Sequence, residues 1–148
     1  MTRRTFLGLL LAIAVAMAAA PIHAATIVVT TTVDELTTNG NCSLREAVRA
    51  ANTNAAVDAC PAGQNDQTDT ITVPAGTYTL ALAGLDNDAS AGDLDLLDNT
   101  AVDDLVISGA GAATTIVQAC TVDQQAADCP AGQGVVERVF HVIDGSAA

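Results

Sequence analysis

Oxygen-bearing side chains are concentrated between residues 86 and 95, where six of ten residues carry one. Side chains two apart in a strand share a face, so Asp93 and Asp95 are expected to project from the same side. Because Ca²⁺ is coordinated by oxygen ligands, the stretch predicts a weak extracellular calcium site. Its ligands would be Asp86, Asp88, Ser90, Asp93 and Asp95.

An EF-hand loop that begins at Asp86 is excluded, because Ala91 and Leu97 stand where that loop requires Gly and Glu. The alternative interpretation is that Leu94 and Leu96 point into a core and that the aspartates are the solvated face of the strand. The sequence alone leaves both interpretations open.

No residue is assigned a catalytic role. His141 lies alone between two apolar residues, and nothing beside Arg138 would make it a base. Ser43 has no partner base. A glycan lyase or hydrolase needs carboxylates and a base on one face of the fold, and the sequence shows no pattern that would place them together. No cofactor is expected apart from the calcium ion.

Four cysteines, Cys42, Cys60, Cys120 and Cys129, predict disulfides in an oxidising compartment. We favour Cys42–Cys60 and Cys120–Cys129, because cysteines near in sequence meet at low loop-closure cost. A Cys60–Cys129 bridge is the alternative, since both open the same five-residue run, Cys-Pro-Ala-Gly-Gln, 69 residues apart. A zinc site is disfavoured because no two cysteines have the C-x2-C spacing.

Residues 1–24 have the order of a secretory signal: Arg3 and Arg4, an apolar stretch, then a small residue at Ala24, after which cleavage is expected. The arginine pair also resembles the twin-arginine export motif. A retained membrane anchor is the alternative, although the apolar stretch is shorter than a spanning helix needs. We therefore expect an exported protein, located outside the cell, at its surface or in the periplasm, with no membrane span in the mature chain.

The chain is acidic and poor in aromatic residues. Its 148 residues carry 17 acids and 5 bases, and aromatic residues make up 2%. Two of the bases precede residue 25, so the mature part is more acidic still. This charge argues against a nucleic-acid partner, which would need a basic face. The core must be built from small and branched aliphatic residues.

A short helix is predicted over residues 44–53. Ser43 and Glu46 have the spacing of a capping box, and apolar residues recur at helical spacing on one side. Arg45 and Arg49 lie off that stripe and are expected to be surface charges that pair with Glu46 or nearby acids. The helix should cover an apolar surface with its stripe, which comprises Leu44, Ala47, Val48 and Ala51.

From residue 69 onward, short strands alternate with turns rich in Gly and Pro. Apolar positions in different strands recur at 22 or 23 residues, as in the series Ile71, Leu94, Ile116 and Val139. Such a period predicts stacked coils, and we expect an all-β parallel β-helix. A β-sandwich is disfavoured because it would bring aromatic residues to its core. The strands expected are 25–34, 70–73, 78–82, 93–96, 105–107, 115–117 and 139–143.

The segment Cys42–Ala47, with Ala50–Asn52 after it, resembles the signature of CSLREA-domain proteins, which are secreted bacterial proteins. Pro74–Tyr78 is also similar to the first coil of pectin-lyase-like β-helices. The resemblance implies a right-handed parallel β-helix that begins with a capping α-helix. It divides the chain into a leader (1–24), a strand and capping-helix segment (25–68) and the first coils (69–148), which look like the start of a longer protein.

The resemblance implies little about activity, because this fold hosts adhesins and enzymes alike. We expect a non-catalytic, structural or adhesion-like module of a secreted or cell-surface protein. The alternatives are the opening segment of a polysaccharide lyase or glycoside hydrolase, or a glycan-binding module. An extracellular glycan or a cell-surface component would then be the partner.

Overall fold

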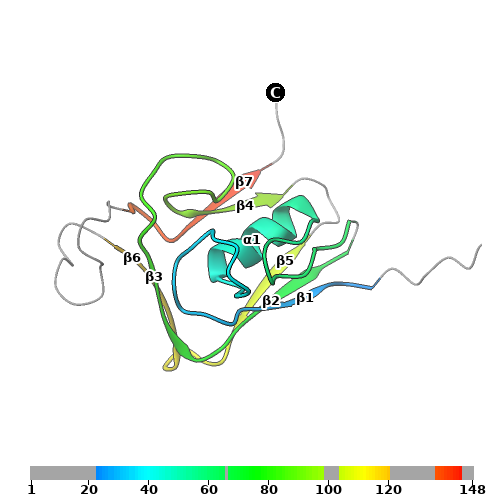
Figure 1. Ribbon diagram of the computed structural model, residues 1–148, viewed down its shortest axis with the longest axis horizontal. Coiled ribbons are helices and arrows are strands. Elements are labelled where there is room, and N and C mark those ends of the chain that lie inside the picture. Colours follow the sequence, from blue (N-terminus) through cyan, green and yellow to red (C-terminus); the bar gives the residue numbers. More distant parts are fainter. Residues whose placement is uncertain (1–22, 66, 99–103, 121–135, 145–148) are drawn as a thin grey trace, which may run out of the picture.

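The computed structural model describes residues 23–65, 67–98, 104–120 and 136–144. These residues form seven short strands and one helix, so the described chain is mostly β (Figure 1). In chain order the elements are β1 (Thr26–Val28), α1 (Leu44–Thr53), β2 (Asp69–Val73), β3 (Gly76–Leu80), β4 (Leu94–Asp98), β5 (Leu105–Gly109), β6 (Thr115–Ala119) and β7 (Phe140–Asp144).

Every pairing between these strands is parallel. One sheet has the order β1-β2-β5, and two further sheets pair β3 with β6 and β4 with β7. The chain thus passes through three strands twice, and each strand of the second pass lies beside its counterpart from the first. Parallel neighbours need a long crossover, which the other strands of the pass supply. A β-sandwich, whose sheets are antiparallel, does not fit these pairings.

The predicted spacing of about 23 residues between equivalent strands is wrong. Paired residues are 36 positions apart in β2 and β5, where Asp69 faces Leu105, and 46 apart in β4 and β7. Ile71 pairs with Ile107 and not with Leu94, because β2 and β4 belong to different sheets. Loops of unequal length join the strands of each pass, so no single period describes the spacing between paired strands.

The apolar core lies between the sheets and α1. Ile27, Ile71 and Ile107 occupy the same register on β1, β2 and β5, so their side chains form one row. The first two are fully buried. Helix α1 contacts β1, β2 and β4 and lies among the strands in Figure 1. The aliphatic interior expected from the composition is present.

Helix α1 has the bounds that its pattern predicts. The Ser43 Oγ accepts a hydrogen bond from the Glu46 amide at 3.1 Å, and the Glu46 carboxylate accepts one from the Ser43 amide at 2.9 Å. Both bonds of the capping box are therefore made. Asn54, in the left-handed conformation, ends the helix.

Arg45, which was expected to be a surface charge on α1, is buried, and so is the capping residue Glu46. Arg45 is 0% exposed and Glu46 is 1% exposed, because loops cover the helix on the sides away from its apolar stripe. Glu46 caps the helix, while Arg49 pairs with Asp88 and not with Glu46. Only Arg49 has the partly exposed position that the pattern predicts.

Cys42 and Cys60 form a disulfide that joins the residue before the α1 cap to the loop after the helix. This excludes the Cys60–Cys129 alternative. Cys120 is not free, but Cys129 lies outside the described residues, as does the second Cys-Pro-Ala-Gly-Gln run.

The leader prediction also falls largely outside the described residues, since residues 1–22 are not among them. The strand expected over 25–34 is reduced to β1 (Thr26–Val28), although the Val29 amide still donates to the Thr72 carbonyl at 3.0 Å. Within the described ranges, no helix combines the length and the apolar character that crossing a bilayer requires.

Tyr78 offers a direct probe of this core, because it is the only tyrosine in the chain. Its side chain is buried, its hydroxyl donates to the Pro74 carbonyl at 3.1 Å, and burial raises its pKa. We expect the phenolate absorbance of the folded protein to appear at higher pH than in the urea-unfolded chain, which should titrate near pH 10. The contribution of Tyr78 to the free energy of unfolding should be fully present below pH ~10 and should be lost as the pH rises through the raised pKa. Identical titration of the folded and unfolded chains would contradict this.

Candidate functional site

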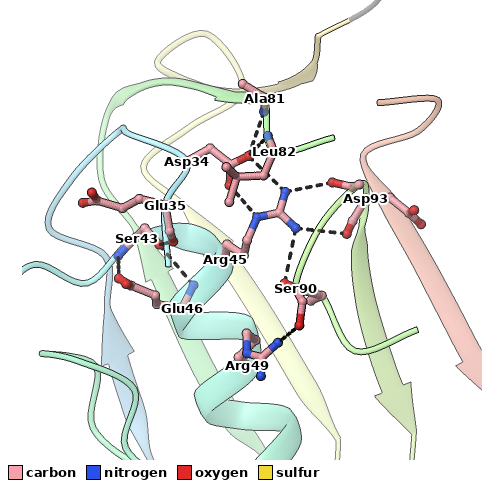
Figure 2. Close-up of polar contacts among 12 residues, drawn as sticks. Asp34, Glu35, Ser43, Arg45, Glu46, Arg49, Ala81, Leu82, Ser90 and Asp93 are labelled. Carbon is pink, nitrogen blue, oxygen red and sulfur yellow. Dashed lines mark hydrogen bonds and ion pairs between the residues drawn. The ribbon is translucent and has the colours of Figure 1, made fainter. Parts of the chain in front are cut away.

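Arg45 lies at the centre of the polar network that joins α1 to the rest of the molecule (Figure 2). Its Nε and Nη2 atoms donate to both carboxylate oxygens of Asp34, at 2.6 and 3.0 Å. Nη2 also donates to the Gly92 carbonyl at 2.8 Å, and Nη1 donates to the carbonyls of Ala89 and Asp93 at 3.3 and 3.4 Å. All five N–H groups of the buried guanidinium therefore have an acceptor.

Asp34 brings a further segment into the network. The side chain of Asp34 is 3% exposed and lies in the loop between β1 and α1. Besides Arg45, its Oδ2 accepts from the amides of Ala81 and Leu82 at 2.7 and 2.9 Å, just after β3. One bidentate ion pair thus connects the loop after β1, helix α1 and the chain that leaves β3.

The turn before β4 has the backbone shape needed to offer its carbonyls to Arg45. Ala89 and Gly92 both have positive φ, at 57° and 63°. A Cβ on Gly92 would lie 2.5 Å from the Gly84 carbonyl oxygen, so only glycine fits there. The turn closes through the Gly92 amide, which donates to the Leu82 carbonyl at 2.6 Å.

Asp93 and Asp95 extend the network to β7. The Arg138 Nε lies 2.6 Å from Asp93 Oδ2, and the His141 Nδ1 lies 2.9 Å from Asp95 Oδ1. Asp95 is 0% exposed, and its other oxygen accepts from the Ala89 amide at 3.1 Å. The hydrogen bond and the charge of Asp93 raise the pKa of the Arg138 guanidinium.

The prediction that these aspartates are a solvated face is wrong. Leu94 does point into the core, but Asp93 and Asp95 are buried as well. Pairing in register brings His141 of β7 directly beside Asp95 of β4, and the turn before β4 covers the other side. The strand is therefore covered on both faces at its start.

Of the four aspartates predicted to bind calcium, only Asp93 and Asp95 belong to a group of acidic and histidine side chains close enough to share one metal ion in the described part of the chain. Asp86 accepts from the amides of Asp88 and Ser90 within its own turn. Asp88 and the Ser90 hydroxyl contact Arg49, and the hydrogen bond with Ser90 is the main cause that lowers the pKa of Asp88. These groups stabilise the turn and hold it against α1.

A different triplet does converge. The ligand atoms of Asp93, Asp95 and His141 lie within 4.8 Å of one another, which is the spacing of groups that could hold a metal ion. The sequence pattern presents His141 as isolated and places Asp34 only at the end of an expected strand. The partners of these residues lie 46 and 11 positions away in sequence, so no local pattern signals them.

An open cavity of about 390 Å³ lies beside this triplet. Gly84, Leu85, Gly92, Asp93, Glu137 and Arg138 line it. His141 is one-third exposed, while Asp95 is enclosed. A small cation from solvent would therefore approach through His141 and Asp93, where it would compete with the Arg138 guanidinium for the Asp93 carboxylate.

We expect Arg45→Lys to destabilise the protein by about 2–4 kcal/mol, because an ammonium has three donors where five acceptors are placed. Arg49→Lys is the matched control on the same helix. Its partner Asp88 is more than half exposed, so this change should cost about 0.5 kcal/mol or less. Urea unfolding of both variants measures the difference. Equal stabilities would show that the five contacts of Arg45 do not hold the fold.

The chain was compared with protein-family models, with curated proteins and with solved structures, and nothing matches it.

Proposed function

We propose that this chain is an exported structural module in which the two passes of strands are the first coils of a right-handed parallel β-helix and α1 closes one end of it. The observation that carries the proposal is the pairing of each strand in the second pass with its counterpart in the first. Coils stacked in this way leave the first strands with an open end, and a solenoid needs that end covered.

The six-residue segment by which the chain resembles CSLREA-domain proteins supports an architectural role. Each of its residues helps to close this end, through the disulfide, the helix cap, core packing or the buried ion pair. These residues are Cys42, Ser43, Leu44, Arg45, Glu46 and Ala47. All six residues are buried, so none of them presents a solvent-exposed side chain to a substrate.

Export is supported by the leader-like residues 1–24 and by the Cys42–Cys60 disulfide, which is typical of oxidising compartments. A role in catalysis has weaker support. Asp93, Asp95, Arg138 and His141 do gather carboxylates and a base on neighbouring strands, but Asp95 is enclosed and Asp93 is held in an ion pair. Neither carboxylate is free for acid–base chemistry on a glycan.

The test is to express the full chain with its leader in a bacterial host, as the unmodified protein and as Leu44→Asp, Val48→Asp and Thr53→Asp variants. The unmodified protein should appear outside the cytoplasm, shortened and resistant to protease. Val48 is fully buried and Leu44 nearly so, so a carboxylate there should abolish protease resistance. Thr53, exposed on the same helix, is the control. Retention of the uncut chain in the cytoplasm would overturn export, and folded Leu44→Asp and Val48→Asp variants would overturn the closing role of α1.

A second function, cation binding, is favoured by the convergence of Asp93, Asp95 and His141. An imidazole with two carboxylates suits Zn²⁺ or Mn²⁺ better than Ca²⁺, which prefers oxygen ligands alone. The imidazole and the carboxylates would hold the ion, and the Arg138 guanidinium would have to leave Asp93 for it to bind.

We therefore expect Zn²⁺ to raise the melting temperature of the mature protein more than Ca²⁺ does. His141→Ala should remove the zinc effect. Arg138→Ala should bind zinc more tightly than the unmodified protein, since it frees the carboxylate of Asp93 from its competitor. Calorimetric titration measures the affinities. An unchanged affinity in His141→Ala, or a loss of affinity in Arg138→Ala, would refute this site.

A further inference from the structure

Asp69, the first residue of β2, is a buried carboxylate that has no ion pair in the described part of the chain. It is 4% exposed. Its oxygens accept from two backbone amides: Oδ1 from Ala25 at 3.0 Å, and both oxygens from Gln64 at 3.2 and 3.0 Å. A Cβ on Gly63 would lie 2.4 Å from Oδ2, so the loop closely covers the carboxylate. An ionised carboxylate in this position is costly without a cation.

The nitrogen that donates to Asp69 belongs to the Ala24–Ala25 peptide bond, where leader cleavage is expected from the sequence. His23 and Ala24 are exposed, whereas Ala25 is half-buried and its carbonyl accepts from the Thr70 amide at 2.9 Å. The bond therefore lies where an exposed segment enters the sheet. A peptidase can reach its leader side, and the product nitrogen already lies beside the carboxylate.

We propose that cleavage after Ala24 creates the missing cation. Hydrolysis adds hydroxide from water to the Ala24 carbonyl carbon and a proton to the Ala25 nitrogen, and the leader departs with the new carboxylate. The free amine takes a further proton at neutral pH and becomes an ammonium that pairs with Asp69. The inference rests on the proposed export, and it makes processing a step that completes the fold.

The ion pair would hold β1 against β2. β1 has only three residues, yet it places Ile27 in the core row beside Ile71. A charge-assisted hydrogen bond is roughly twice as strong as the neutral amide bond that the uncleaved chain makes. Cleavage thus fastens β1 to β2, and the processed chain is more stable than its precursor.

The test uses two forms of the protein that both begin at Ala25, one with a free amine and one N-acetylated. The acetyl group restores an amide N–H and so reproduces the bond of the uncleaved chain. The free-amine form should have a folding equilibrium constant about five- to tenfold larger. In the Asp69→Asn background the ratio should fall to about twofold or less. Equal stability of the two forms would overturn the ion pair.

A second measurement covers the case in which Asp69→Asn fails to fold. The chain contains no lysine, so the α-amine is the only primary amine of the processed protein. An amine-reactive reagent should label it about tenfold more slowly in the folded than in the urea-unfolded protein, because pairing keeps it protonated. Equal rates would overturn the proposal. So would an exported protein whose first residue, read by mass spectrometry, is not Ala25. Failure of export would instead refute the proposed function, since the two purified forms need no export.

Discussion

The structure depends on the requirement that a buried guanidinium have a partner for each of its donors. Arg45 is fully buried, and its five N–H groups bond to one carboxylate and three carbonyls. Those acceptors come from the loop after β1 and from the turn before β4. Both segments lie outside the paired strands, so strand pairing does not place them against α1. A hydrophobic side chain could fill the same volume, but it could not specify where the five acceptor atoms lie.

The same network sets the geometry of the Asp93–Asp95–His141 triplet. The Asp93 carbonyl turns toward Arg45 while its carboxylate turns toward Arg138. The next inward residue, Leu94, enters the core, and Asp95 meets His141 across the β4–β7 pair. Each of the three arginines after residue 24 pairs with an aspartate from another segment. In so acidic a chain, the few cations lie where segments of the fold meet.

Much of the local structure was predictable from the sequence. The capping box and the apolar stripe define α1 to the residue, because both signals depend on neighbours three or four positions apart. The strands from β2 onward were predicted to within a few residues at each end. The 23-residue period failed because apolar positions in different sheets look equivalent in sequence, while the loops between them differ in length.

By itself, then, the sequence determined which segments are helix or strand and how the helix begins and ends, and it favoured Cys60 as the partner of Cys42 because of the low loop-closure cost. Only the tertiary structure decided which strands are neighbours and which charges are buried. Arg45 and Arg49 lie one helical turn apart and have the same side-chain chemistry, yet one is enclosed and the other is partly exposed. The difference arises because the turn before β4, more than 40 residues away, places three of its carbonyls over Arg45 and only one, that of Asp88, over Arg49. Burial is a property of the assembled chain and not of the residue type.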